Sequence, residues 1–114
     1  MTPLSAVDFH VMMVLAEAPS YGYAIMKAVA EHSNGAVSPE IGSLYRVLAR
    51  LVDEGWVEET TPPRGARQGA RGLPRRYYAL TAAGRRVAHG EARRLSQVVA
   101  LARERNLLPG GRAG

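Results

Sequence analysis

Two short stretches with strand-forming side chains interrupt a sequence whose other segments have helical spacing. Residues 56–61 read WVEETT and residues 75–80 read RRYYAL, and both contain the aromatic or β-branched residues that favour strands. The proline pair at 62–63 ends the first stretch, because proline has no N–H to give to a neighbouring strand. The intervening glycines and arginines are predicted to form a loop. We therefore predict a mainly α fold with one small β-hairpin, which has a long basic tip.

The hairpin ends in two adjacent tyrosines that should fix it to the body of the protein. Because successive side chains of a strand point to opposite faces, one of Tyr77 and Tyr78 should pack into the core and the other should face the opposite side. Trp56, at the start of the first strand, is expected to fill the core.

Two helices are predicted in the first part of the chain. The first spans residues 4–17, after Thr2 as N-cap and Pro3 in the first turn. It is apolar on nearly every side, which indicates burial partly under a second subunit. The second follows a break at 18–20, where Ser20 is expected to cap it, and it ends at Asn34-Gly35, since both residues tolerate a left-handed conformation.

The third helix, predicted at residues 39–54 after a Ser-Pro-Glu start signal, has two different faces. Gly55 should end it. Successive residues are about 100° apart in a helix, which follows from 3.6 residues per turn. That spacing gives one apolar face, formed by Ile41, Leu44, Tyr45, Leu48, Leu51 and Val52. The opposite face is small or charged and consists of Gly42, Ser43, Arg46, Ala49, Arg50 and Asp53.

A last helix of about 25 residues should begin after Thr81 as its cap. The order of elements is then helix, helix, helix, hairpin, helix. This order is typical of a winged helix-turn-helix, in which the third helix enters the major groove of DNA and the hairpin, called the wing, lies along the backbone or minor groove.

Charge is segregated along the chain, which supports a partner with phosphate groups. Of the 114 residues, 1–63 carry a net charge of −5 and 64–114 a net charge of +10. Nearly all basic residues are arginine, whose planar fork suits phosphates and base edges. A GC-rich genome also raises arginine content, so the segregation is more informative than the number.

Several classes of function are disfavoured by what the sequence lacks. There are no cysteines, which removes disulfides and thiolate chemistry. His10, His32 and His89 fall on different predicted elements, so we expect no metal and no cofactor. No nucleophile–base pair or phosphate-binding glycine motif indicates an enzyme. No apolar run has the length of a membrane span and the start does not resemble a signal peptide, so the expected location is cytoplasmic.

Three blocks of sequence resemble the PadR-like family of transcriptional regulators. They read APSYGYAIMKAV, SPEIGSLYRVLARLVDEGWV and GLPRRYYALTAAGRR, and the resemblance extends from residue 4 to about residue 90. Arg46 stands where the family often has proline, which adds charge to the exposed face of the third helix. The short tail is similar to the compact branch of the family, which dimerises through its last helix.

The resemblance implies a sequence-specific DNA-binding regulator, expected to act as a ligand-responsive repressor. Its partners would be double-stranded DNA with a pseudo-palindromic operator and a second copy of the chain. A small-molecule effector of unknown identity is a further candidate partner. It would bind between the last helix and the first helix of the second copy. The expected parts are 1–80 for DNA binding, 81–108 for dimerisation and 109–114 as a frayed tail.

The candidate site residues follow from the exposed helix face, the basic tip and the apolar stripes. Tyr45 lies at the edge of the apolar face, where it either packs or donates to a phosphate. Glu91 interrupts the stripe of the last helix and either pairs with an arginine across a dimer interface or is exposed. The DNA-binding candidates are Ser43, Tyr45, Arg46, Arg50, Arg64, Arg67, Arg71, Arg75 and Arg76, and the dimerisation candidates are Leu4, Val11, Val87, Leu95, Val98 and Ala102.

Two other functions stay open on the sequence. A winged helix can use a basic wing to bind an acidic protein partner, and this is the main alternative. An RNA-binding module is less favoured, because RNA readers commonly stack exposed aromatic side chains on unpaired bases, and few such side chains are expected on this surface.

Overall fold

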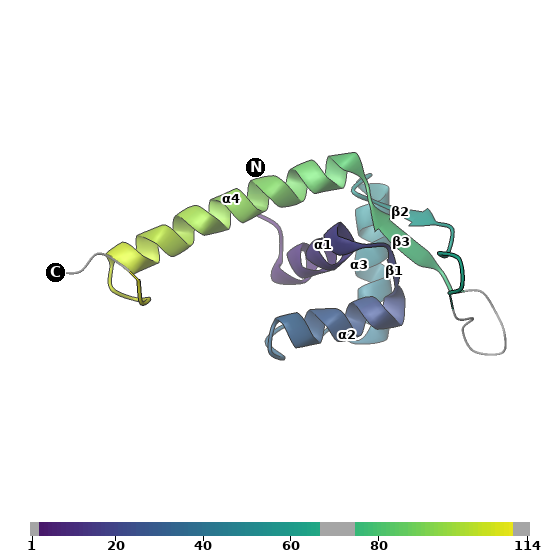
Figure 1. Cartoon of the computed structure of the whole chain (residues 1–114), viewed down its shortest axis with the longest axis horizontal. Coiled ribbons are helices and arrows are strands. Elements are labelled where there is room, and N and C mark those ends of the chain that lie inside the picture. The colour runs from purple at the N-terminus through teal and green to yellow at the C-terminus, as the bar shows by residue number, and fades with distance from the viewer. Residues whose placement is uncertain (1–2, 67–74, 111–114) are drawn as a thin grey trace.

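The computed structural model describes residues 3–66 and 75–110, and this part of the chain forms four helices and a small antiparallel sheet (Figure 1). This confirms the mainly α winged helix-turn-helix fold that the sequence predicts. The elements in chain order are α1 (Ala6–Glu17), β1 (Ser20–Tyr21), α2 (Gly22–His32), α3 (Ile41–Asp53), β2 (Val57–Thr60), β3 (Tyr77–Leu80) and α4 (Ala82–Glu104).

The sheet has three strands in the order β1-β3-β2, and the strand β1 was not predicted. Val57 lies opposite Leu80 and Thr60 opposite Tyr77, as expected for the wing. On the other edge of β3, Ser20 pairs with Tyr78 and Tyr21 with Tyr77. The prediction that Ser20 caps α2 is therefore wrong. The N-cap of α2 is Tyr21, which makes no side-chain capping bond, because its extended backbone is held by β3 instead.

Two other helix starts also differ from the prediction. Ser5, not Thr2, caps α1, and its hydroxyl accepts a hydrogen bond of 3.1 Å from the backbone N–H of Asp8. Helix α3 begins at Ile41, after an extended Glu40 that makes no side-chain cap bond. The predicted stops are right: Asn34 and Gly35 follow α2 with φ of 53° and 81°, and Gly55 follows α3 with φ of 79°.

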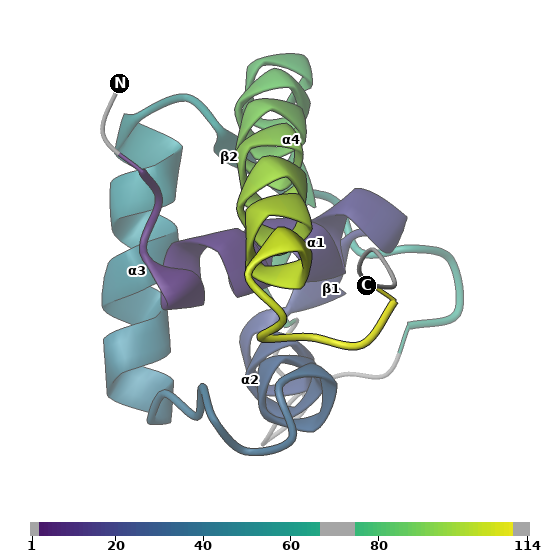
Figure 2. The ribbon, with the colours of Figure 1, turned by 90° about the vertical axis from the view of Figure 1, so that its left-hand side faces the viewer.

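Helix α1 lies in the middle of the protein, between α2, α3 and the first half of α4 (Figure 2). Its burial explains its apolar sequence, although Met13 is partly exposed. Packing these helices on one side of the sheet removes a continuous set of apolar side chains from water. The core consists of Val11, Met12, Val14, Leu15, Ile25, Val29, Leu44, Leu48, Leu51, Val57 and Tyr78.

Helix α4 starts on the body of the protein and then extends well beyond it (Figure 1). Thr81 caps it as predicted, accepting a hydrogen bond of 3.0 Å from the N–H of Gly84. Its 23 residues span about 35 Å at 1.5 Å per residue. Val87 and Ala88 pack against the core, whereas the distal half extends away from the other described helices and strands (Figure 1). Within residues 3–66 and 75–110, no helix has both the length and the apolar character needed to cross a membrane.

Candidate nucleic-acid interface

The outward face of α3 presents one arginine that is free of acidic partners. Arg46 is exposed, and its Nη2 donates a hydrogen bond of 3.0 Å to the hydroxyl of Ser43. The two residues are one turn apart, the spacing at which helix side chains meet. Among the described residues, no carboxylate forms an ion pair with Arg46. Both candidate side chains therefore lie together where a duplex has access to them.

Arg50, the second predicted arginine of this helix, points elsewhere. Its Nη2 lies 2.5 Å from Oδ1 of Asp8, a buried carboxylate in the first turn of α1. This hydrogen bond raises the pKa of Arg50, with a further contribution from the negative charge of Asp8. The contact with Asp8 restrains the direction of the Arg50 guanidinium, although the side chain is still 51% exposed. The sequence did not predict this intramolecular contact.

Tyr45 packs against the start of α2 while part of its ring faces solvent. The residue is 42% exposed. A Cβ atom placed on Gly22 would lie only 2.6 Å from the Tyr45 hydroxyl oxygen. Only glycine at position 22 leaves room for this ring. Of the two predicted roles, the structure supports packing, and the hydroxyl end of the ring is the part nearest to Gly22.

The two arginines at the base of the wing each have a partner within the chain. The guanidinium carbon of Arg75 lies 4.2 Å from the ring centroid of Tyr21, a cation–π contact. Tyr21 in turn lies beside Tyr77, with centroids 5.5 Å apart and rings inclined by 56°. Arg76 is exposed and has Nε 3.6 Å from a carboxylate oxygen of Glu59. These contacts bind the C-terminal end of the basic segment to the sheet.

Of the remaining wing arginines, only Arg64 is described, and it is exposed. Arg67 and Arg71 lie outside the described residues. As predicted, one of the two tyrosines of β3 enters the core and the other lies on the opposite side: Tyr78 joins the core cluster, while Tyr77 is buried against Tyr21. Burial raises the pKa of the Tyr78 phenol, so this hydroxyl stays neutral at physiological pH.

A groove of about 340 Å³ separates α3 from the wing strands. It carries two carboxylates, Asp53 and Glu59, and one guanidinium, that of Arg76. The excess of negative charge does not suit a phosphate, because like charges repel at this separation. The outward side of α3 around Arg46 is therefore a better candidate for a DNA-facing surface than the groove beside the wing.

A second cavity, of about 180 Å³, lies between the N-terminal segment and α4. Its walls include Leu4, Trp56 and Val87, with Glu91 and Arg94 at one side. Trp56 packs against the core, as predicted, and also lines this cavity.

Glu91, on the wall of this cavity, is buried instead of exposed, and it pairs with Arg94 of its own helix through bonds of 2.8 and 2.9 Å. The hydrogen bonds from Arg94 lower the pKa of Glu91. Neither predicted alternative included this i,i+3 partner.

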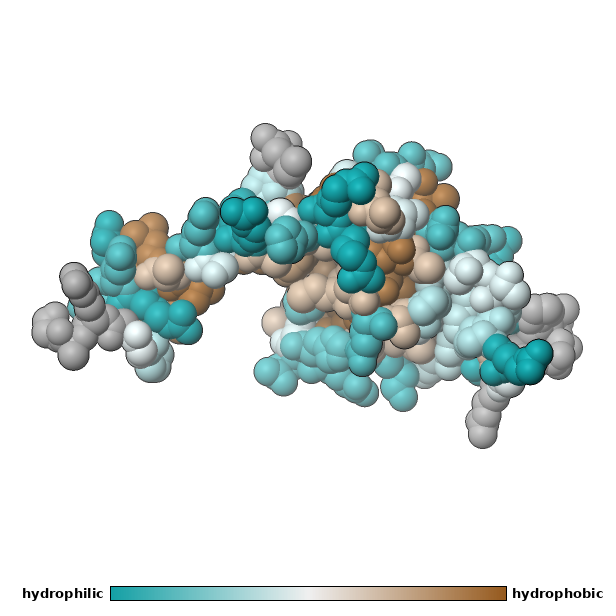
Figure 3. Space-filling view, turned by 45° about the horizontal axis from the view of Figure 1, so that its top comes forward, coloured by the Kyte–Doolittle hydropathy of each residue, from teal (hydrophilic) through white to brown (hydrophobic). Residues whose placement is uncertain are grey.

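The predicted dimerisation residues separate into a buried and an accessible group. Val11 is 0% exposed inside the core of its own chain, so a second copy cannot reach it, and it is removed from the set. Leu4 and Val87 pack partly against the core. The distal half of α4 exposes apolar surface, visible at the far end of the helix in Figure 3. The large exposed apolar side chains are Val98, Val99 and Leu101 on α4, and Leu107 and Leu108 just after it.

Two residues that shape this site were absent from the prediction. Tyr21 makes the cation–π contact with Arg75. It lies in β1, a strand of only two residues, which is too short to be predicted from its sequence. Asp8 had a visible signal, because it is a carboxylate in the apolar part of the first helix, well before Glu17 at the end of that helix. Such a carboxylate is buried only with a partner, and the partner is Arg50. No group of three or more His, Asp or Glu side chains suited to a metal ion occurs in the part of the chain that the structure describes.

A three-helix body followed by a β-hairpin, with an exposed arginine on the third helix, defines a winged helix-turn-helix protein of the DNA-binding type. The family model described as "Transcriptional regulator PadR-like family" matches residues 11–90. The chain therefore belongs to the PadR-like family of transcriptional regulators, as its sequence motifs suggested.

Solved structures share the same fold at low sequence identity. A PadR family transcription regulator from Clostridium difficile is 18% identical with a TM-score of 0.70, over 88% of this chain and 97% of that chain. A PadR-like regulator from Bacillus cereus is 23% identical with a TM-score of 0.69, over 92% and 93%. Bacillus subtilis PadR, solved in complex with operator DNA, is 23% identical with a TM-score of 0.61, over 75% and 46%. No curated protein sequence matches the chain.

Proposed function

We propose that this protein is a homodimeric transcriptional repressor that reads a pseudo-palindromic operator through α3. The observation that carries this proposal is the position of Arg46, which is exposed on the outward face of α3 without an acidic partner. A guanidinium there suits bidentate donation to guanine O6 and N7 in the major groove. The hydrogen bond to Ser43 orients the arginine, and the hydroxyl is also within reach of a phosphate or a base edge.

The basic segment of the wing supplies sequence-independent affinity in this proposal. Arg64, Arg67 and Arg71 are assigned to phosphates, which position a protein on DNA without reading its sequence. Arg75 and Arg76 are assigned mainly to holding the C-terminal end of that segment, because Tyr21 and Glu59 already bind them. Tyr45 remains a candidate for a single phosphate contact through its hydroxyl.

Dimerisation is assigned to α4 and divides the chain into three parts. The proposed parts are 1–80 for DNA binding, 81–108 for dimerisation and 109–114 as a tail. Support comes from Val98, which is 50% exposed on a helix that extends away from the body, and from Leu107, which is 76% exposed just after that helix. Apolar surface of this kind is typical of protein–protein contacts. Leu4, Val87, Leu95 and Ala102 complete the proposed interface.

The effector is proposed to act at the base of α4. A small apolar molecule in the cavity beside Trp56 would contact both the N-terminal segment and α4, and we propose that its binding changes the angle between the body and the dimerisation helix. In a dimer this angle sets the distance between the two recognition helices. Trp56 is the only tryptophan, and its fluorescence therefore reports ligand entry.

A DNA-binding experiment tests the proposal directly. Duplexes from the promoter next to the gene are titrated with protein in a mobility-shift assay at physiological salt, against scrambled duplexes of the same composition. We expect preferential binding to two half-sites about 34–36 Å apart. A promoter–reporter assay then tests repression. The alternative, a winged helix that binds an acidic protein, predicts no retention of any duplex at this salt concentration.

A further inference from the structure

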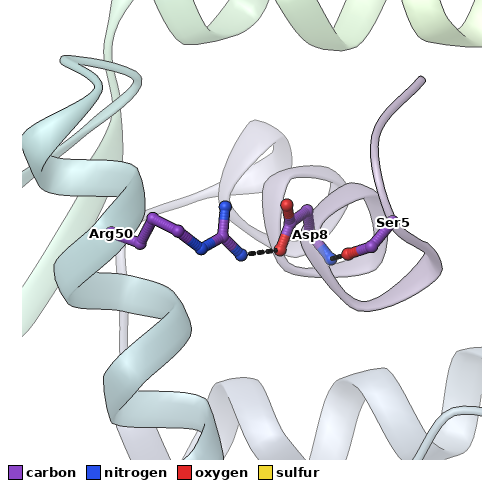
Figure 4. Close-up of polar contacts among 3 residues, drawn as sticks. All are labelled: Ser5, Asp8 and Arg50. Carbon is purple, nitrogen blue, oxygen red and sulfur yellow. Dashed lines mark hydrogen bonds and ion pairs between the residues drawn. The ribbon is translucent and has the colours of Figure 1, made fainter. Parts of the chain in front are cut away.

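An ion pair between Arg50 and the buried carboxylate of Asp8 connects α3 to the central helix α1. Figure 4 shows the Arg50 side chain reaching from α3 to Asp8, whose backbone N–H is bound by Ser5. The side chain of Asp8 is only 8% exposed, while that of Arg50 is 51% exposed. The pair therefore joins a buried carboxylate to a guanidinium that is still partly exposed to solvent.

The pair lies on the side of α3 that faces away from the wing. Arg46 and Arg50 are four residues apart, so their directions around the helix axis differ by only about 40°. On the other side of Arg46, Ala49 and Val52 line the groove that faces the wing strands. Arg50 is therefore close enough to the outward face to turn toward a bound duplex. Its ion pair with Asp8 directs the side chain toward α1 instead.

The contact with Asp8 is stronger than the one that a phosphate in water would offer. A buried carboxylate without a partner is costly, because its lost hydration is not replaced. Moving Arg50 to a phosphate would leave Asp8 in that state. The exchange is unfavourable, and the pair should persist when DNA binds.

We propose that Asp8 is a positioning residue that holds Arg50 against α1 and thereby withholds one positive charge from DNA. The inference rests on the proposed DNA-binding function. Phosphate contacts add affinity for every sequence alike, and non-specific sites greatly outnumber operators in a genome. Restraining Arg50 limits this sequence-independent binding and leaves Arg46 as the arginine of α3 that meets DNA.

The experiment compares four variants with the parent: Asp8→Ala, Glu17→Ala, Arg50→Gln and the double variant Asp8→Ala/Arg50→Gln. Glu17→Ala is the matched control, because it removes one negative charge from an exposed position on the same helix. The affinity for a non-operator duplex is measured between 50 and 200 mM salt. One additional phosphate contact makes the slope of log K against log salt steeper by about 0.9.

We expect Asp8→Ala to show this steeper slope, Glu17→Ala and Arg50→Gln to keep the slope of the parent, and the double variant to return to it. A role of the pair in stability alone would move none of these slopes. The proposal is overturned if Arg50→Gln flattens the slope by about 0.9, since Arg50 would then contact a phosphate in the parent. It is also overturned if folded Asp8→Ala keeps the parent slope. If Asp8→Ala does not fold, Arg50→Gln alone decides.

A heparin column separates failure of this inference from failure of the proposed function. Heparin is a polyanion that carries no base sequence, so elution reports the freed charge whether or not the protein reads an operator. We expect Asp8→Ala to elute at higher salt than Glu17→Ala, which has the same net charge. Equal elution overturns the inference. Equal binding of the parent to promoter and scrambled duplexes would instead refute the proposed function and leave the heparin result to decide on Asp8.

Discussion

Gly84, in the first turn of α4, lies directly against the backbone of Trp56, so that a Cβ atom at position 84 would overlap the Trp56 carbonyl group. The same atom would be 2.8 Å from Cδ1 of Leu80. The carbonyl oxygen of Trp56 also accepts a hydrogen bond of 3.0 Å from the N–H of Thr81. The start of α4 is thereby fixed to the segment between α3 and β2, which sets the direction in which the long helix leaves the body.

Replacing Gly84 by alanine should therefore destabilise the protein. The methyl group meets backbone atoms, which cannot rotate away as a side chain can, and we expect a loss of about 2–3 kcal/mol in the free energy of unfolding. Urea denaturation followed by circular dichroism measures it. Gly90→Ala is the control on the same helix. Its added methyl meets no atom within 4 Å, and it should stabilise by about 0.5–1 kcal/mol. Equal stability of the two variants would contradict the contact.

Thr81 should contribute to stability through its hydroxyl group. This group accepts from the N–H of Gly84 and donates a hydrogen bond of 2.7 Å to the carbonyl oxygen of Gly55. Thr81→Ala should cost about 1–2 kcal/mol, the upper part of the range for a lost N-cap. Thr81→Ser keeps the hydroxyl and should cost much less. Thermal unfolding of the two variants checks the difference, and an equal loss in both would assign the effect to the methyl group.

Arg46→Ala should weaken discrimination at one base pair of each half-site. Loss of a bidentate contact to guanine removes about 1–3 kcal/mol of preference for that base. Binding to duplexes that carry each of the four bases in turn locates the position. Arg86→Ala removes the same charge from an exposed site on α4 and should leave the preference intact. Unchanged discrimination in Arg46→Ala would exclude Arg46 as the base-reading residue.

The Glu91–Arg94 pair should stabilise the protein in a pH-dependent way. Arg94 lowers the pKa of Glu91 in the folded state, so the unfolded chain takes up a proton at a higher pH than the folded one does. The contribution is complete above the unfolded value of about 4.3 and is lost as the pH falls through the lower folded pKa. Unfolding free energies of the parent and Glu91→Gln should differ at pH 7 and converge in acid. A difference that stays constant to low pH would contradict this linkage.

Val98→Asp should dissociate the proposed dimer. In a two-fold symmetric interface, each substitution occurs once on each subunit, so one change introduces two carboxylates. Burying unpaired carboxylates is strongly unfavourable. We expect association to weaken by at least about tenfold, measured by sedimentation equilibrium. Gln97→Asp introduces the same charge at the neighbouring exposed position and serves as the control. A dimer of unchanged affinity in Val98→Asp would exclude this part of α4 from the interface.

The sequence by itself determined the order of the helices, the wing and the faces of α3. These features depend on short-range physics: the 3.6-residue spacing of Leu44, Leu48 and Leu51, the left-handed Gly55, and the hydroxyl cap of Thr81 act within one or two turns of the chain. A short stretch of sequence contains all the atoms involved. The three PadR-like blocks added the family, which the family model confirms.

Only the tertiary structure decided which charges face outward. The directions of Arg46 and Arg50 differ by only about 40° around one helix, yet Arg46 is exposed and Arg50 is bound to Asp8. Likewise, β1 exists because β3 lies beside it, and Tyr21 then holds Arg75. In each case the partner is distant in the chain. Its contact arises from how the elements pack against one another, and neither helical spacing nor composition contains that information.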